Sequence, residues 1–341
     1  MSGKTAYNTQ MNKEELGIEI TDLVSTLKKK GKIHLAQCIE ENWQKTCLEY
    51  SKELNMWSPG KMMEPELIEA FDKELERLGT TNDQKIKILA SLSKQRILQT
   101  TPHLTATGGP RMLCIDWLAS LGVKKEDFYV VAMFSGIPFS NSFRPGRIHM
   151  KNSSVNLFPS TMQDDLVYRS TIQEKLIESI KILPKEIVGL LPKASAGESY
   201  TKWALSVCQN IERKILGKDN LIFVDINEVI SNYLAQMLKN KECVFYKIFF
   251  DPVTRKKFME AFPNESMFYC SVMDGKYRKT ENMTFSTDSL RSKNKEISLR
   301  EPEILITELE RGRVCPGLIV SFLTLVFFNQ FKCLGSFAQV E

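Results

Sequence analysis

Residues 127–134, Asp-Phe-Tyr-Val-Val-Ala-Met-Phe, constrain the fold more than any other stretch of the sequence. The run is too apolar to alternate, which is typical of a central parallel strand that is buried on both faces. Before it come a short β-prone stretch at 97–101, a turn-forming loop, and a helix that opens at Pro110 and ends at Gly122, a candidate left-handed cap. Strand, glycine-bearing loop, helix and strand form a βαβ unit and predict an α/β fold.

The segments on either side of this unit give a coarse secondary structure. Apolar residues at helical spacing fill 12–93, with Glu and Lys in the gaps. The pattern predicts further helices over about 163–191, 200–216, 228–240 and 251–262, and strands over 220–225, 244–250 and 267–272. It also predicts a polar insertion or long loop that begins after Gly136 and continues through Lys151, and loop-like sequence over 275–300.

We therefore expect a Rossmann-like parallel sheet with helices on both faces, together with an N-terminal helical region. The expected units are a helical region at 1–93, a core at 94–265 with an inserted segment around 137–200, and the remainder of the core at 266–341. Two or three units suit a chain of 341 residues. The abrupt end at Glu341 is interpreted as a truncation of the core.

Composition narrows the class of protein. Forty-six Lys and Arg against 41 Asp and Glu leave a net charge of +5, too little to indicate a nucleic-acid partner. Eight dispersed cysteines without a CxxC pair, and a polar start to the chain, favour a reduced, cytoplasmic protein. Three histidines argue against a multi-histidine metal centre. The apolar run at 318–328 is shorter than the ~20 residues of a membrane span, so we expect a buried helix and no membrane partner.

The loop at 103–110 is the strongest candidate site, because ligands of open α/β sheets bind beyond the carboxyl ends of strands. Its glycines would let a phosphate approach the backbone, and the following helix would present free N–H groups. The polar and glycine residues of this loop are the candidate ligands of a phosphate or carboxylate: His103, Thr105, Thr107, Gly108 and Gly109. A plain strand-to-helix turn, with His103 capping backbone groups, is the alternative.

Two further candidates follow predicted strands. Ser135 is followed by a basic stretch in which Arg144 and Arg147 are suited to bidentate contacts with an anion, although a solvated loop is as good an interpretation. Asp225 ends the strand at 220–225 and would either receive ribose hydroxyls or cap the next helix, because Asp225 and Glu228 have the spacing of a capping box.

The order of these pieces resembles the bacillithiol-biosynthesis cysteine-adding enzymes. The resemblance is carried by Leu98-Gln-Thr-Thr-Pro-His-Leu-Thr-Ala-Thr-Gly-Gly-Pro110, the strand at 128–134, the segment Leu309-Glu-Arg-Gly-Arg-Val-Cys-Pro316, and the stretch from Phe331 to Glu341. It implies a Rossmann-like core related to class I aminoacyl-tRNA synthetases, with inserted connecting pieces.

The leading hypothesis is a small-molecule biosynthetic ligase or transferase that binds a nucleotide or an amino-acid-like substrate. The candidate catalytic residues are His103, Arg144 and Arg147, and Asp225 or Gln339 would orient the substrate. The cofactor is left open, with ATP as one candidate. The competing hypothesis is a non-catalytic binding protein that keeps the fold without the chemistry, with self-association through the N-terminal helices.

Overall fold

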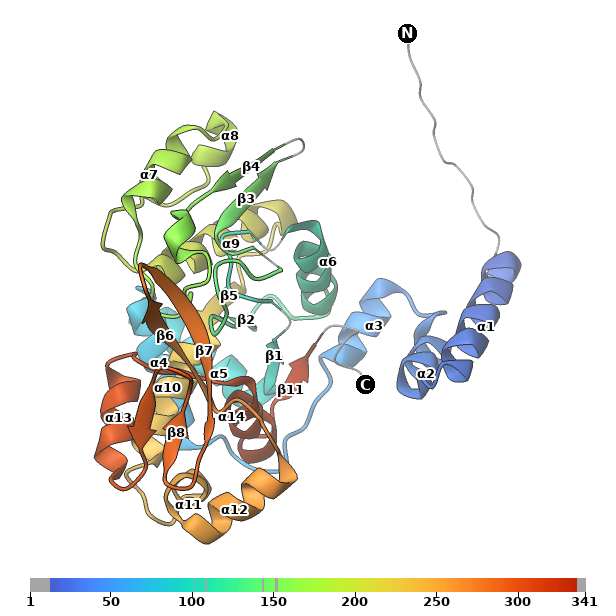
Figure 1. Cartoon of the computed structure of the whole chain (residues 1–341). Coiled ribbons are helices and arrows are strands. Elements are labelled where there is room, and N and C mark those ends of the chain that lie inside the picture. Colours follow the sequence, from blue (N-terminus) through green and yellow to red (C-terminus); the bar gives the residue numbers. More distant parts are fainter. Residues whose placement is uncertain (1–12, 101, 108, 143, 151–152, 336–341) are drawn as a thin grey trace.

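The computed structural model describes residues 13–100, 102–107, 109–142, 144–150 and 153–335 (Figure 1). The structure is mixed α/β and contains a four-stranded parallel sheet, a five-stranded antiparallel sheet and a two-stranded hairpin. The helices are α1 (Lys13–Lys29), α2 (Ile33–Asn42), α3 (Cys47–Leu54), α4 (Pro65–Arg77), α5 (Asn82–Gln95), α6 (Gly109–Ser120), α7 (Glu174–Lys181), α8 (Lys185–Val188), α9 (Tyr200–Leu216), α10 (Ile226–Met237), α11 (Val244–Phe250), α12 (Pro252–Ala261), α13 (Pro302–Glu310), α14 (Leu318–Phe322), the 3-10 turn η1 (Ser160–Met162) and the π-helical turn η2 (Leu323–Phe328). The strands are β1 (Ile97–Gln99), β2 (Tyr129–Met133), β3 (Arg147–Met150), β4 (Ser153–Asn156), β5 (Leu221–Asp225), β6 (Phe268–Asp274), β7 (Tyr277–Phe285), β8 (Ser289–Arg291), β9 (Glu296–Ser298), β10 (Cys315–Pro316) and β11 (Lys332–Leu334).

The parallel sheet has the strand order β11-β1-β2-β5. Both β2 and β5 are buried along their whole length, so the prediction of a buried parallel strand within 127–134 is confirmed. Leu98 pairs with Cys333 of β11, and Gln99 pairs with Val131 of β2. Because all four strands run the same way, their carboxyl ends meet at one edge of the sheet.

The antiparallel sheet has the order β10-β6-β7-β8-β9. The β6–β7 hairpin is its longest element, with pairs that run from Phe268 and Met283 to Asp274 and Tyr277 at the tip. β10 pairs with the start of β6 and lies next to α10, so this sheet is joined to the helices that follow the parallel strands.

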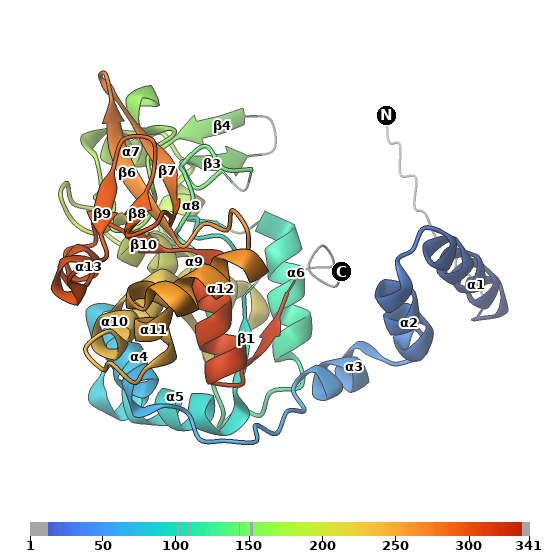
Figure 2. The ribbon, with the colours of Figure 1, turned by 60° about the horizontal axis from the view of Figure 1, so that its bottom comes forward.

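The N-terminal helices divide into two groups. Figures 1 and 2 show α1, α2 and α3 as an arm that extends from the body of the protein. α4 belongs to the body, because Leu67, Phe71 and Leu75 lie one helical turn apart and enter the same core as Val131 of β2. The arm is tied to the body where Ser51 donates a hydrogen bond to the carbonyl of Ala119.

The strand predicted at 244–250 is wrong, because this segment is α11. Phe245, Ile248 and Phe249 are buried at helical spacing, and the rings of Tyr246 and Phe250 pack with centroids 4.9 Å apart. The periodicity of a short apolar run does not distinguish a buried helix from a buried strand, which explains the error.

The loop predicted at 275–300 is also wrong, because this stretch forms β7, β8 and β9. Gly275, with φ of +62°, allows the tight turn that closes the β6–β7 hairpin. In β7, Glu281 and Met283 are buried on either side of exposed Asn282. A strand with one solvated face carries so many polar residues that its sequence looks like a loop.

The helix predicted over 163–191 is confined to α7 and α8. Arg169 has φ of +51°, which no right-handed helix accommodates, and Pro184 follows the end of α7. The stretch expected as a polar insertion or loop from after Gly136 through Lys151 includes β3, which pairs with β4.

Gly122 is not a left-handed cap, since α6 ends at Ser120 and Gly122 is absent from the positive-φ conformations of the described residues. A Cβ at Gly122 would instead lie 2.7 Å from the backbone nitrogen of Lys52, so glycine permits the close approach of α3.

The apolar run at 318–328 is helical, as expected, and forms α14 and η2. Val320, Leu323 and Leu325 are buried, whereas Leu318, Phe322 and Phe327 are exposed, so the segment buries only one side. Within the residues described, no helix has both the length and the apolar character that a membrane crossing requires.

Candidate functional site

The loop after β1 turns its polar side chains toward the protein itself. His103 forms a parallel bridge with Phe134, and its Nδ1 lies 2.9 Å from Oδ1 of Asn141. Burial lowers the pKa of His103, which favours the neutral ring. The hydroxyl of Thr105 is within 3.4 Å of the carbonyl of Thr107. Gly109 opens α6 with φ of +72°, and Gly108 lies outside the described residues.

The two predicted arginines lie just before β3 and at its first residue. Arg144 is exposed, with φ of +54°, and Arg147 begins β3 opposite Asn156. His103 and the chain near Arg144 are linked through Asn141, whose carbonyl accepts a hydrogen bond from the Arg144 amide. None of the cavities described below includes His103 or either arginine in its lining. Their catalytic roles stay predictions.

Ser135 and Asp225, both predicted ligand-binding residues, are brought together by the structure. They lie at the ends of neighbouring strands, and Oγ of Ser135 donates a hydrogen bond of 2.8 Å to Oδ1 of Asp225. The same oxygen accepts the amide N–H of Asn227 at 3.0 Å. Both side chains are fully buried. Of the two alternatives for Asp225, the structure shows the helix cap, here for α10.

Glu74 extends this buried network to α4. Its Oε1 accepts the amide N–H of Asp225 at 2.9 Å, and its carboxylate forms a bidentate ion pair with Arg77. Burial, followed by the nearby carboxylates of Glu228 and Glu74, raises the pKa of Asp225. Oδ2 of Asp225 is buried without a hydrogen-bond partner. The network therefore holds the ends of β2 and β5 against α4. Buried charged groups need well-placed partners, so this network fixes the geometry of the three elements.

A cavity of ≈620 Å³ lies at the carboxyl edge of the parallel sheet. The residue that follows each of the four strands contributes to its wall: Gly335 after β11, Thr100 after β1, Phe134 after β2 and Ile226 after β5. This volume falls within the range of ~300–1,000 Å³ that small-molecule sites occupy. The position is the one at which open parallel sheets bind ligands.

Side-chain alternation explains why the floor of this carboxyl-edge cavity is apolar. The pairings of Leu98 with Cys333 and of Gln99 with Val131 place Thr100, Ala132 and Cys333 on one face of the sheet. That face is covered by α14 and η2. Leu318, Phe322 and Leu325 from these turns, with Phe262 after α12, form the opposite wall.

The polar groups of the carboxyl-edge cavity are few. Oγ of Ser321 already donates to the carbonyl of Gly317 at 3.0 Å. Glu265 is exposed at the rim, and no Lys, Arg or His is found among the described residues that line the cavity. The walls suit an apolar body, and Glu265 suits a positively charged group on it.

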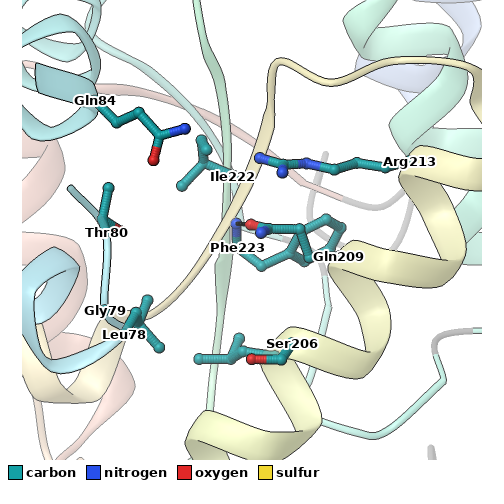
Figure 3. Close-up of a pocket in the computed structure, with 10 residues that line it drawn as sticks. Leu78, Gly79, Thr80, Gln84, Ser206, Gln209, Arg213, Ile222 and Phe223 are labelled. Atoms are coloured by element: carbon teal, nitrogen blue, oxygen red, sulfur yellow. Dashed lines mark hydrogen bonds between the residues drawn. The ribbon is translucent and has the colours of Figure 1, made fainter. Parts of the chain in front are cut away.

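A smaller cavity, of ≈140 Å³, lies between α9, β5 and the turn after α4 (Figure 3). Oε1 of Gln209 accepts the amide N–H of Phe223 at 3.3 Å, and Nε of Arg213 donates to the carbonyl of Leu221 at 2.8 Å. The side chains that point toward this space thus hold the backbone of β5. The cavity has room for waters and not for a cofactor.

Asp116 of α6 and Glu212 of α9 form a buried carboxyl pair that sequence reasoning missed. They lie over the other face of the sheet, beside Gln99. Burial raises the pKa of Glu212 to about 9 and that of Asp116 to about 6. The sequence offers no signal for the pair, because the two acids are 96 positions apart and lie on separate helices.

No protein-family model matches the chain, and no curated protein matches it. Within the described ranges, no three His, Cys, Asp or Glu side chains are grouped as a metal site would require. The predicted residue Gln339 lies outside the described residues. The carboxyl-edge cavity is the best-supported candidate site on geometry, because the residues that follow all four parallel strands line it.

Proposed function

We propose that the chain binds a small amine-bearing molecule with an apolar or aromatic body in the carboxyl-edge cavity. The observation that carries the proposal is that all four parallel strands end at this one space. An aromatic ring would lie against Phe134 and Phe322, and an ammonium group would approach Glu265. Such a ligand has the chemistry of an amino-acid-like substrate.

We propose further that the sheet is Rossmann-like. The parallel order β11-β1-β2-β5 supports this, because β2 and β5 extend the sheet from one side of β1 and β11 adds to the other side. A reversal of this kind is the position at which doubly wound sheets bind ligands. Thr100 and Cys333 border the cavity at this reversal.

The enzymatic form of the proposal is a small-molecule biosynthetic ligase that uses ATP. The described residues that line the carboxyl-edge cavity include no cation that would neutralise a triphosphate, so the nucleotide would need a different part of the molecule.

A non-catalytic binding protein is the second candidate, and one observation favours it. The groups predicted to act on a substrate are already occupied: Ser135 bonds to Asp225, and His103 bonds to Asn141.

Three indole ligands of similar shape test the proposed site. Tryptamine carries an ammonium group, indole-3-ethanol is neutral, and indole-3-acetate is an anion. Ligand-detected NMR titration should give affinities in that order, with tryptamine favoured about two- to fivefold over indole-3-ethanol, because an exposed ion pair contributes up to ~1 kcal/mol. Glu265→Gln should remove that preference without changing the affinity for indole-3-ethanol.

Phe322 and Phe327 provide a matched pair of variants. Both rings are largely exposed, and their centroids are 5.5 Å apart, but only Phe322 lines the cavity. Phe322→Ala should weaken tryptamine binding about tenfold, the scale of one aromatic contact, whereas Phe327→Ala should leave it unchanged. Equal affinities in both variants would contradict the proposed site.

A further inference from the structure

A second cavity, of ≈680 Å³, lies away from the carboxyl edge and has the opposite chemistry. Its three walls are residues 161–173, the β6–β7 hairpin, and the turn at 311–313 that precedes β10, and Lys295 from the turn between β8 and β9 also lines it. We call it the basic cavity. Six cationic side chains line it: Arg169, Lys276, Arg278, Lys295, Arg311 and Arg313.

Only part of this positive charge is neutralised. Glu228 pairs with Arg169, and Glu308 pairs with both Lys295 and Arg313. Together with Asp165 in the lining, the acids number three against six cations, so the cavity keeps an excess of three positive charges.

Three of the cations have no close carboxylate. Arg311 is exposed and forms no ion pair with any described residue. Arg278 reaches Asp165 only at 4.0 Å, and Lys276 lies over the ring of Tyr277 instead of beside an acid. Because they converge on a concave space, these charges would raise the local concentration of an anion.

The guanidinium of Arg169 is held rigidly at the floor of the basic cavity. Its Nε and Nη2 each donate a 2.8 Å hydrogen bond to the Glu228 carboxylate, and its Nη1 donates to the carbonyl of Glu310 at 2.7 Å. The group also lies over the ring of Tyr168, 5.4 Å from the centroid. A left-handed backbone at a residue with a long side chain is costly and persists only where the surroundings enforce it.

The lining also excludes some anions. Tyr168 is the aromatic residue among the described lining side chains, and Arg169 covers its face. A nucleobase would therefore have no free ring to stack on, whereas single-stranded nucleic-acid sites rely on such rings. Guanidinium groups match the geometry of phosphate oxygens and bind them through paired hydrogen bonds.

We infer that the basic cavity binds a compact, non-aromatic small molecule that carries two or more phosphate groups, such as a sugar bisphosphate or an oligophosphate. The excess of three positive charges matches the charge of such a ligand, and the volume admits a molecule of this size. The inference does not depend on the carboxyl-edge cavity, whose ligand is a cation.

Calorimetric titration of the full chain with inorganic tripolyphosphate tests the inference. At low ionic strength the chain should bind one tripolyphosphate, and Arg311→Ala and Arg278→Ala should each weaken binding at least about tenfold, as expected for a hydrogen bond to a charged group. Both side chains are exposed, so the melting temperature should stay unchanged. If Arg278→Ala unfolds the β6–β7 hairpin, the tripolyphosphate affinity of Arg311→Ala by itself is compared with that of the wild-type chain.

Arg291 and Arg300 serve as matched controls. Both are exposed arginines near the antiparallel sheet, and neither lines the basic cavity. Their alanine variants should bind tripolyphosphate within about twofold of the wild-type chain, and ATP should bind no more tightly than tripolyphosphate. Absence of binding up to 1 mM, on the order of the weakest useful affinity, or equal losses in all four variants, would overturn the inference. Tighter binding of a thymidine 20-mer, weakened equally by Arg291→Ala, would likewise overturn it and assign the surface to nucleic acid.

Discussion

Gly312 lies directly against the side chain of Arg169, so closely that a Cβ at position 312 would overlap Cδ and the guanidinium of the arginine. Gly312 also has φ of +65°, and Arg169 has φ of +51°. Two left-handed residues from segments about 140 positions apart therefore depend on each other. The contact fixes the turn before β10 against the loop before α7, and these are two of the three walls of the basic cavity.

Gly312→Ala should destabilise the protein by about 2–4 kcal/mol, because it adds backbone strain and displaces Arg169 from Glu228. Gly275→Ala is the matched control. Gly275 has nearly the same φ, +62°, but has nothing within 4 Å of its missing Cβ, so its variant should lose only about 1 kcal/mol. Urea unfolding measures both. If the two variants lose similar amounts of unfolding free energy, the side chain of Arg169 moves away from the added Cβ at position 312 without an energetic cost, and the proposed dependence of the two residues on each other is wrong.

Glu228→Gln should cost about 2–3 kcal/mol of unfolding free energy, because it breaks a mostly buried, bidentate ion pair. Although burial opposes the charge of Arg169, the hydrogen bonds that its guanidinium donates to Glu228 raise the pKa of Arg169, so the arginine would stay charged beside a neutral amide. Glu296→Gln removes an exposed pair with Arg291 and should leave the unfolding free energy nearly unchanged, because solvent screens exposed ion pairs. A loss below 1 kcal/mol for Glu228→Gln would contradict the structural role of the pair.

The Asp116–Glu212 pair predicts that stability falls as the pH rises. Burial raises the pKa of Glu212 to about 9 from 4.5, so the folded chain keeps a proton that the unfolded chain releases. Between about pH 5 and pH 9, unfolding free energy should therefore decrease with a slope of up to ~1.4 kcal/mol per pH unit. Glu212→Gln should flatten this slope when unfolding is measured across the same range. An unchanged slope would assign the pH dependence to other groups.

Leu323→Asp should prevent soluble expression, because Leu323 is only 9% exposed and an unpaired buried carboxylate costs several kcal/mol. Phe327→Asp, at a position in the same turn that is 61% exposed, should express normally. Normal solubility and an unchanged melting temperature for Leu323→Asp would refute the burial of this side of η2.

The sequence predicts those parts of the fold whose pattern reflects a single environment. β2 and β5 are buried on both faces, so their unbroken apolar runs identify them. Segments with two environments are predicted poorly. β7 looks like a loop because much of it is solvated, and α11 looks like a strand because its seven residues are too few to show a helical period.

The candidate sites depend on tertiary contacts that no local pattern encodes. Ser135 and Asp225 are each predicted as candidate ligand-binding residues because each follows a predicted strand, but that they are neighbours joined by a hydrogen bond follows only from the fold. The left-handed backbone at position 169 could not be predicted, because the residue there is an arginine and not one of the residues, such as glycine or asparagine, that commonly adopt this conformation. The basic cavity is lined by residues 161–173 and residues 311–313, which are far apart in the sequence, so no local pattern could predict it.

Amide chemical-shift mapping with tryptamine tests the proposed site most directly, because it reports where on the chain the ligand lies. The account predicts that the largest shifts cluster at Thr100, Ser321, Phe322 and Cys333, around the carboxyl-edge cavity. It also predicts no shifts at His103, Thr105 or Arg144. Shifts that cluster at those three residues, or that spread without a centre at ligand concentrations near the dissociation constant, would contradict it.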